Sequence, residues 1–292
     1  VVPLRDLKAE CIQATLNLLV KRHPSLRVRV QSFSKLCILD SDTPNQFPLE
    51  IEKFSLNKSD SFETSSVISK ILKKHQSSLN IHLDGGRPIG IVNKAIWFRS
   101  DQLEHQRLVF ISHHIAVDAQ TWPILLNDFE KFYPKIENQN FNFDKYNSGH
   151  SIVNYANALN DDCLASKHSI HLNVPTGSVE KAKDTIIIPK MGSLKSKSEQ
   201  LGISLEVSLL GTLAKSLGVS ITIHRESIGR NLDQYNLECG STVGWFTAVS
   251  ALFYDADIDL ISNLRTIQSK IINNQYNEPK HTAEYFNDYE PN

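Results

Sequence analysis

The sequence has almost no excess of charge of either sign. Among its 292 residues, 31 Lys and Arg stand against 32 Asp and Glu, a formal net charge of −1. A surface that attracts nucleic acid or an anionic membrane through its overall field needs a clear basic excess. The balance therefore argues against nucleic acid, a membrane surface or another polyanion as the partner.

Long hydrophobic runs are also missing. A membrane-spanning helix needs roughly 20 consecutive apolar residues, and no stretch of this chain approaches that length. The N-terminus lacks the pattern of a secretory signal peptide. The composition, 40% hydrophobic and 22% charged, predicts a soluble, cytoplasmic protein with one large core or two smaller ones. Because the chain begins at Val1 and its only methionine is Met191, we expect a segment of a longer protein.

Cysteine is scarce, and the common cofactor motifs are absent. The 4 cysteines lie far apart without a metal-binding spacing, which predicts reduced and mostly buried thiols. The sequence contains no glycine-rich phosphate loop, no Gly-x-Ser-x-Gly elbow and no dinucleotide fingerprint. The missing dinucleotide fingerprint gives no sign of a nicotinamide cofactor. We expect no metal, because His113, His114 and Asp118 supply only a partial ligand set with no matching Cys or His cluster elsewhere; zinc or iron is the minor alternative.

The first half of the sequence alternates between helix-period and strand-period patterns. Apolar residues at helical spacing predict helices at 2–21, 62–74 and 119–133, the first of them ended by His23-Pro24. Apolar or alternating runs predict strands at 26–30, 35–39, 49–54, 91–99 and 107–112, with a turn at 84–88. The last two strands are expected to be neighbours.

The second half repeats this alternation after a polar, Asn-rich stretch at 134–151, which predicts a linker or a long crossover. Helices are predicted at 152–159, 194–201, 205–217 and 258–273, and strands at 185–188, 219–224 and 246–253. The sequence thus predicts two layered α/β (α+β) lobes, at residues 1–140 and 141–292, with a cleft between them.

The most informative stretch is Ile111-Ser112-His113-His114-Ile115-Ala116-Val117-Asp118, where two histidines and a carboxylate follow an apolar run. Loops held by a rigid scaffold often carry catalytic groups. Successive side chains of an extended backbone point in opposite directions. We expect His114 to be a general base in the cleft, and His113 a packed, hydrogen-bonded neighbour. Asp118 can cap the helix that follows; the alternative is two histidines and a cap without chemistry.

A second cluster of polar residues lies at Ile223-His224-Arg225-Glu226-Ser227-Ile228-Gly229-Arg230. Glu226 is a candidate second acid/base. Arg230 is long enough to pair with a buried carboxylate such as Asp118. The alternative is a strand end whose charges are simply solvated.

A third feature is Ser241-Thr242-Val243-Gly244-Trp245-Phe246-Thr247, a turn that leads into an apolar strand. The missing side chain at Gly244 would allow close approach of a substrate arm, with Trp245 beside it. Core packing of the two aromatic rings is the alternative.

These three segments together resemble the condensation and epimerization domain superfamily of nonribosomal peptide synthetases, whose hallmark is His-His-x-x-x-Asp-Gly. His113 to Asp118 fits the hallmark. The stretches 121–128 and 242–247 are more similar to the epimerization branch than to the condensing branch. Because His23-Pro24-Ser25-Leu26-Arg27 also fits the family, the likeness spans almost the whole chain.

The resemblance implies two chloramphenicol-acetyltransferase-like lobes arranged as a V around a central tunnel. It implies an isomerase of secondary metabolite biosynthesis that epimerizes the Cα of an aminoacyl or peptidyl thioester. His114 and Glu226 would be catalytic, supported by His113, Asp118 and Arg230. Gly244 and Trp245 would contact the substrate arm. The domain itself would bind no cofactor, since the substrate is carried on the phosphopantetheine of a carrier protein; neighbouring synthetase domains are the other expected partners.

The sequence departs from the epimerization branch at several positions. The branch's Glu-Gly-His-Gly-Arg-Glu segment becomes Glu-Ser-Ile-Gly-Arg-Asn at 226–231, and the hallmark's glycine is Ala119. The chain is also shorter than a family domain, which predicts a shortened or partial one. Two alternatives therefore stay open: a condensation domain that forms the amide bond between two carrier-bound substrates, and a catalytically degenerate domain that only docks carrier proteins.

Overall fold

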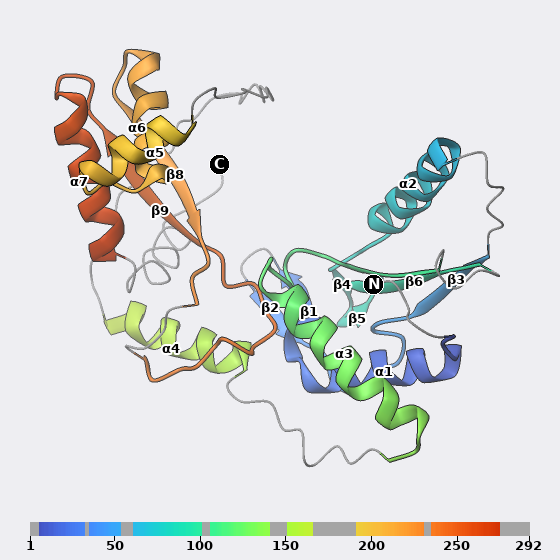
Figure 1. The fold of residues 1–292 in the computed structure, drawn as a ribbon. Coiled ribbons are helices and arrows are strands. Elements are labelled where there is room, and N and C mark those ends of the chain that lie inside the picture. Colours follow the sequence, from blue (N-terminus) through green and yellow to red (C-terminus); the bar gives the residue numbers. More distant parts are fainter. Residues whose placement is uncertain are drawn as a thin grey trace. The chain divides into compact units, whose positions relative to one another are not determined.

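The computed structural model describes residues 6–32, 35–53, 61–100, 106–140, 151–165, 191–230 and 235–274, which form two compact units (Figure 1). The first unit holds the described residues up to Asn157 together with Leu237–Phe246, and the second holds the others. The mixed α/β class is confirmed. The lobe boundary between 140 and 141, the V and the tunnel stay predictions, and the strand expected at 185–188 lies outside the described residues.

A three-stranded sheet forms the centre of the first unit. It consists of β3 (Leu49–Lys53), β6 (Asn93–Arg99) and β7 (Arg107–Ser112), with β6 parallel to β3 and antiparallel to β7. The expected pairing of the strands predicted at 91–99 and 107–112 is confirmed. Both faces of β6 are covered, which explains the continuous apolar run at 95–98 in its centre.

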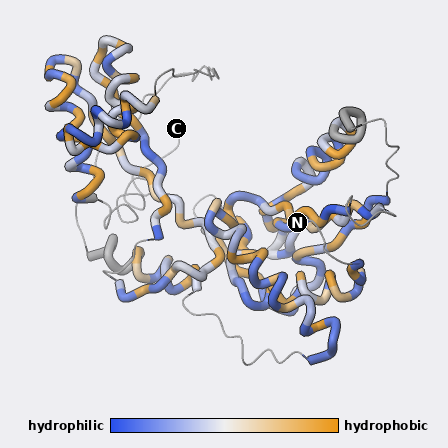
Figure 2. Tube along the Cα trace, in the orientation of Figure 1, coloured by the Kyte–Doolittle hydropathy of each residue, from blue (hydrophilic) through white to orange (hydrophobic). Residues whose placement is uncertain are grey.

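Helices cover the two faces of this sheet (Figure 1). Trp97 of β6 belongs to the large core that also holds side chains of α1 (Ala9–Arg22) and α3 (Thr121–Glu137). Phe98, on the opposite face, packs with side chains of α2 (Ser61–Ser77). In Figure 2 the helices alternate between hydrophobic and hydrophilic residues along their length, as amphipathic helices on a core do.

Two short hairpins complete the described sheet structure of the first unit. The first pairs β1 (Val28–Ser32) with β2 (Lys35–Ile38), and the second pairs β4 (Leu83–Asp84) with β5 (Arg87–Pro88). The strand expected at 26–30 begins only at Val28, because Pro24 opens the 3₁₀ turn η1 (Pro24–Arg27).

The expectation that a linker begins at Pro134 is wrong. α3 continues to Glu137, with Pro134 inside it. Proline removes one N–H from the helix, but Ile136 packs against the large core, and the Glu137 carboxylate lies 3.7 Å from Lys8 Nζ. Burial near the C-terminal end thus outweighs the local preference of proline to end a helix.

The second unit contains a two-stranded antiparallel sheet packed with helices. β8 (Ile221–Ser227) pairs with β9 (Ala248–Tyr254), and residues of α6 (Leu205–Leu217) and α7 (Leu260–Asn274) share a core with β9. α5 (Met191–Gln200) contacts α6, and α4 (Ile152–Ala165) spans the boundary of the two units. The Ser204 hydroxyl caps α6 by accepting from the Val207 amide at 3.2 Å, and Gly218 ends it with a φ of 69°.

A buried ion pair joins α1 to α3, which lie side by side (Figure 1). One oxygen of Asp128 accepts from His23 Nε2 at 2.9 Å and from Arg22 Nε at 2.8 Å. Burial lowers the pKa of His23 below 6.5, and the hydrogen bond and charge of Asp128 only partly oppose this. His23 therefore takes up a proton more readily after unfolding than before it.

We expect the chain to lose stability as the pH falls below 6.5, the ordinary histidine value. The native state then binds fewer protons than the unfolded state, so the free energy of unfolding changes by up to about 1.4 kcal/mol per pH unit for one histidine. His23→Gln should make this slope shallower, measured by urea denaturation between about pH 5 and pH 7.5. An unchanged slope in the variant would contradict the assignment.

Candidate active site

The two histidines lie in the loop between β7 and α3, and His113 is half-buried. Its amide donates to the Val92 carbonyl at 2.9 Å, and its Nδ1 accepts from the Ile115 amide at 3.2 Å. Burial lowers the pKa of His113, and the nearby charges of His114 and His82 lower it further. His113 thus serves as a neutral acceptor that shapes the loop.

The ring of His114 is exposed to solvent. It makes an edge-to-face contact with Trp245, with ring centroids 6.2 Å apart and an interplanar angle of 75°. Exposure leaves its ring nitrogens available to a substrate, which is what a general base requires.

Asp118 and Thr121 fix the end of this loop. Asp118 Oδ1 accepts from the amide and the hydroxyl of Thr121, both at 2.9 Å, so the carboxylate binds the first amide of α3, whose N-cap position is Gln120. Asp118 Oδ2 accepts from the Phe246 amide at 3.2 Å. Thr121 Oγ1 also lies 3.2 Å from Gly244 N and 3.0 Å from Gly244 O. These two buried side chains therefore bind the histidine loop to residues 244–246.

Residues 242–245, which were expected in the second lobe from their position in the chain, pack in the first unit. Val243 belongs to its large core, and Phe246 packs against Tyr155 with ring centroids 4.7 Å apart. A Cβ at Gly244 would lie 2.8 Å from Ile152 Cδ1 and from Phe246 Cε2, so packing alone accounts for the glycine. Contact of Gly244 and Trp245 with a substrate arm stays a prediction.

Three polar residues that support the loop were missed in the sequence. Ser25 Oγ donates to the Ala116 carbonyl at 2.6 Å, and Ser112 Oγ donates to Asn93 Oδ1 at 2.7 Å. Asn93 Nδ2 donates to the Leu26 carbonyl at 2.6 Å. Ser25 and Ser112 lie in stretches that stood out in the sequence, but neither was given a role there.

Glu226 and Arg230 belong to the second unit. Glu226 is exposed on β8 and is paired in register with Val249 of β9. Its neighbour Arg225 pairs with Glu206, with Nε 2.7 Å from Oε1. The expected pair of Asp118 with Arg230 joins residues of different units and stays a prediction, as does the placement of Glu226 opposite His114.

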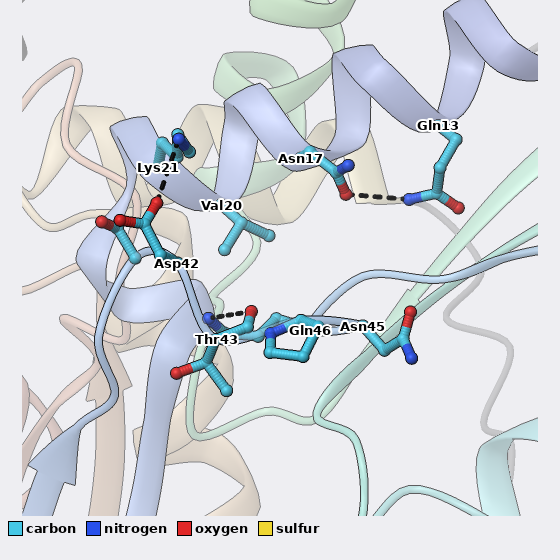
Figure 3. A pocket seen from close by; sticks show the side chains of 10 residues that line it. Gln13, Asn17, Val20, Lys21, Asp42, Thr43, Asn45 and Gln46 are labelled. Carbon is cyan, nitrogen blue, oxygen red and sulfur yellow. Dashed lines mark hydrogen bonds and ion pairs between the residues drawn. The ribbon is translucent and has the colours of Figure 1, made fainter.

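A pocket of about 410 Å³ lies elsewhere in the first unit, between α1 and residues 41–46 (Figure 3). Its lining is polar and includes the exposed ion pair of Lys21 with Asp42, at 3.1 Å, and the hydrogen bond of Gln13 to Asn17, at 2.9 Å. None of the predicted site residues lines it.

Within the described ranges, no group of three His, Cys, Asp or Glu side chains is arranged to hold a metal ion. Among the described cysteines, Cys11, Cys37 and Cys239 form no disulfide. None of the described helices is long and apolar enough to cross a membrane.

Comparison with known proteins identifies the family. The Condensation domain family matches residues 5–157, more than half of the chain, so the chain belongs to that family. This confirms the family resemblance seen in the sequence.

Among curated proteins, the chain is 24% identical over 259 residues to a linear gramicidin synthase of Brevibacillus parabrevis, covering 79% of the chain and 5% of that protein. It is 23% identical over 290 residues to nonribosomal peptide synthetase 5 of Gibberella zeae, covering 90% of the chain and 2% of that protein. The chain thus spans only a small part of these relatives.

Solved structures share the fold. The epimerization domain from the third module of tyrocidine synthetase B has a TM-score of 0.67 at 17% identity, over 96% of this chain and 68% of that one. The X-domain from teicoplanin biosynthesis has a TM-score of 0.66 at 14% identity, over 94% of this chain and 64% of that one. The fold is therefore that of condensation-type domains.

We expect Thr121→Val to destabilise the protein by about 1–3 kcal/mol, because it removes a buried hydroxyl that donates to Asp118 Oδ1 and lies 3.2 Å from the Gly244 amide nitrogen. Thr121→Ser keeps the hydroxyl and should retain most of the stability. Urea denaturation measures both. Thr212→Val is the matched control, since that hydroxyl only donates to the Ser208 carbonyl within its own helix. Equal losses in both valine variants would contradict the role of Thr121.

Proposed function

We propose that this chain epimerizes the Cα of an aminoacyl or peptidyl thioester held on the phosphopantetheine arm of a carrier protein. His114 and Glu226 are the proposed acid/base pair. The observation that carries the proposal is the exposed ring of His114, on a loop held by buried hydrogen bonds and beside Trp245.

Epimerization requires one group that removes the Cα proton and a second that returns a proton to the opposite face. Removal leaves the electron pair in a planar enolate of the thioester, which has lost the original configuration. An imidazole and a carboxyl group can exchange these roles with the direction of turnover. The protein's own side chains suffice for this proton balance.

The second group is assigned to Glu226 because its side chain is exposed on β8. Trp245, which contacts His114, and Val249, which pairs with Glu226, are only four residues apart in the chain. The similarity of residues 242–247 to the epimerization branch supports the same assignment. The curated relatives are peptide synthetases, which supports a carrier protein and neighbouring synthetase domains as partners.

Condensation is the second candidate, favoured by the name of the matching family. In that reaction His114 would position or deprotonate the amine that attacks a second carrier-bound thioester. Amide formation gives Glu226 no evident task. A domain that only docks carrier proteins is the third possibility, in line with Ile228 and Asn231 in place of the branch's His and Glu.

The test is exchange of the Cα proton for deuterium on an aminoacyl carrier protein in heavy water, with the product stereochemistry read afterwards. His114→Gln and Glu226→Gln should each lower the exchange rate by about 10²–10⁴-fold, the usual contribution of a general acid or base. Glu199→Gln is the matched control, because Glu199 is an exposed carboxylate of the same unit, 3.9 Å from Lys195.

Other outcomes separate the alternatives. Undiminished exchange in His114→Gln contradicts the proposal. Amide formation between two loaded carriers, lost in His114→Gln and kept in Glu226→Gln, supports condensation instead. Carrier binding without either reaction supports docking.

A further inference from the structure

We propose that Trp245 is a positioning residue that fixes the orientation of the His114 imidazole. The inference deepens the proposed function, since it rests on His114 as the acid/base. The contact between the two rings can also be tested in the free protein, independently of the reaction that His114 serves.

The surroundings of His114 point to Trp245. Within the described part of the chain, the His114 side chain has no hydrogen-bond partner, and its ring contacts that of Trp245. An exposed imidazole without a partner is free to change rotamer. The edge-to-face contact with Trp245 restricts this freedom, because a rotamer change that turns the imidazole away loses the contact energy.

Trp245 itself is held by its neighbours on both sides. Gly244 is hydrogen-bonded to Thr121, and the Phe246 amide donates to Asp118. Phe246 is fully buried, whereas Trp245 is 42% exposed. The largest side chain of this stretch therefore makes its contact at the surface, and its backbone is anchored by the same residues that end the histidine loop.

An aromatic partner suits a group that must change its protonation state. A carboxylate partner, such as Asp128 beside His23, favours the charged imidazole and binds one of its N–H groups. A tryptophan ring makes favourable contacts with a neutral ring and with a cation. Trp245 can therefore orient His114 through a ring contact that does not require a fixed charge on the imidazole.

The alternative roles of Trp245 make different predictions. A residue that only fills space in the fold would change stability without a specific effect on His114. A wall for the substrate arm would change the KM for the loaded carrier. A positioning residue changes the environment of the His114 ring in the free protein, and it changes kcat more than KM.

The experiment compares Trp245→Phe and Trp245→Ala with the wild-type chain. The ring protons of His114, assigned by their loss in His114→Gln, are followed by NMR in histidine-labelled protein without substrate. We expect a ring-current shift that is largely kept with Phe and lost with Ala. In the exchange assay we expect kcat to fall by about 2-fold to 10-fold with Ala, the range that one aromatic pair supports, with KM within about 2-fold. Phe253→Ala is the matched control, an aromatic residue 47% exposed in the second unit.

Unchanged His114 signals in Trp245→Ala would overturn the proposal, and so would a rise in KM at constant kcat. If Trp245→Ala fails to fold, Trp245→Phe tests the proposal through the ring-current shift of the His114 protons. Loss of that shift in Trp245→Phe, which keeps an aromatic ring, would contradict the positioning role of Trp245. If the wild-type chain catalyses no exchange, the proposed function fails, while the NMR comparison still tests the contact.

Discussion

The buried carboxylate of Asp118 is the interaction on which the described site depends. A side-chain carboxyl group of a residue that is only 6% exposed needs hydrogen-bond partners within the protein. It finds them in the amide and hydroxyl of Thr121 and in the amide of Phe246. Meeting this requirement fixes the start of α3, the end of the histidine loop and the position of residues 244–246 together. The placement of His114 beside Trp245 follows from that arrangement.

Much of the secondary structure could be predicted because its signals are local. β7 has the predicted bounds because an apolar run marks it. α6 has the predicted bounds because Ser204 caps its first turn and Gly218 ends it. Prediction failed where a distant contact outweighs a local preference. Pro134 predicts the end of a helix, but α3 continues because Ile136 is drawn into a core formed by residues far away in the chain.

The residues of the candidate site, too, could be predicted only where their signal is local in the sequence. The histidine pair and Asp118 stand out because their residue types are unusual together at the end of a strand. Ser25 and Asn93 could not be found in this way, because each binds a backbone carbonyl more than 60 residues away, with separations of 91 and 67. A backbone carbonyl has no residue type, so the sequence carries no signature of such a partner. Nor did the order of the chain show that residues 242–245 pack with the first unit.

The packing of residues 242–246 with the first unit affects when the histidine loop can complete its hydrogen bonds during translation. Thr121 and Gly244 are 123 residues apart, and Asp118 and Phe246 are 128 apart. During vectorial synthesis the histidine loop emerges from the ribosome long before the segment that completes its hydrogen bonds. Until then the carboxylate of Asp118 lacks the Phe246 amide, and Val243 is missing from the core. The loop can therefore reach its final form only after Phe246 has been translated, 128 residues after Asp118.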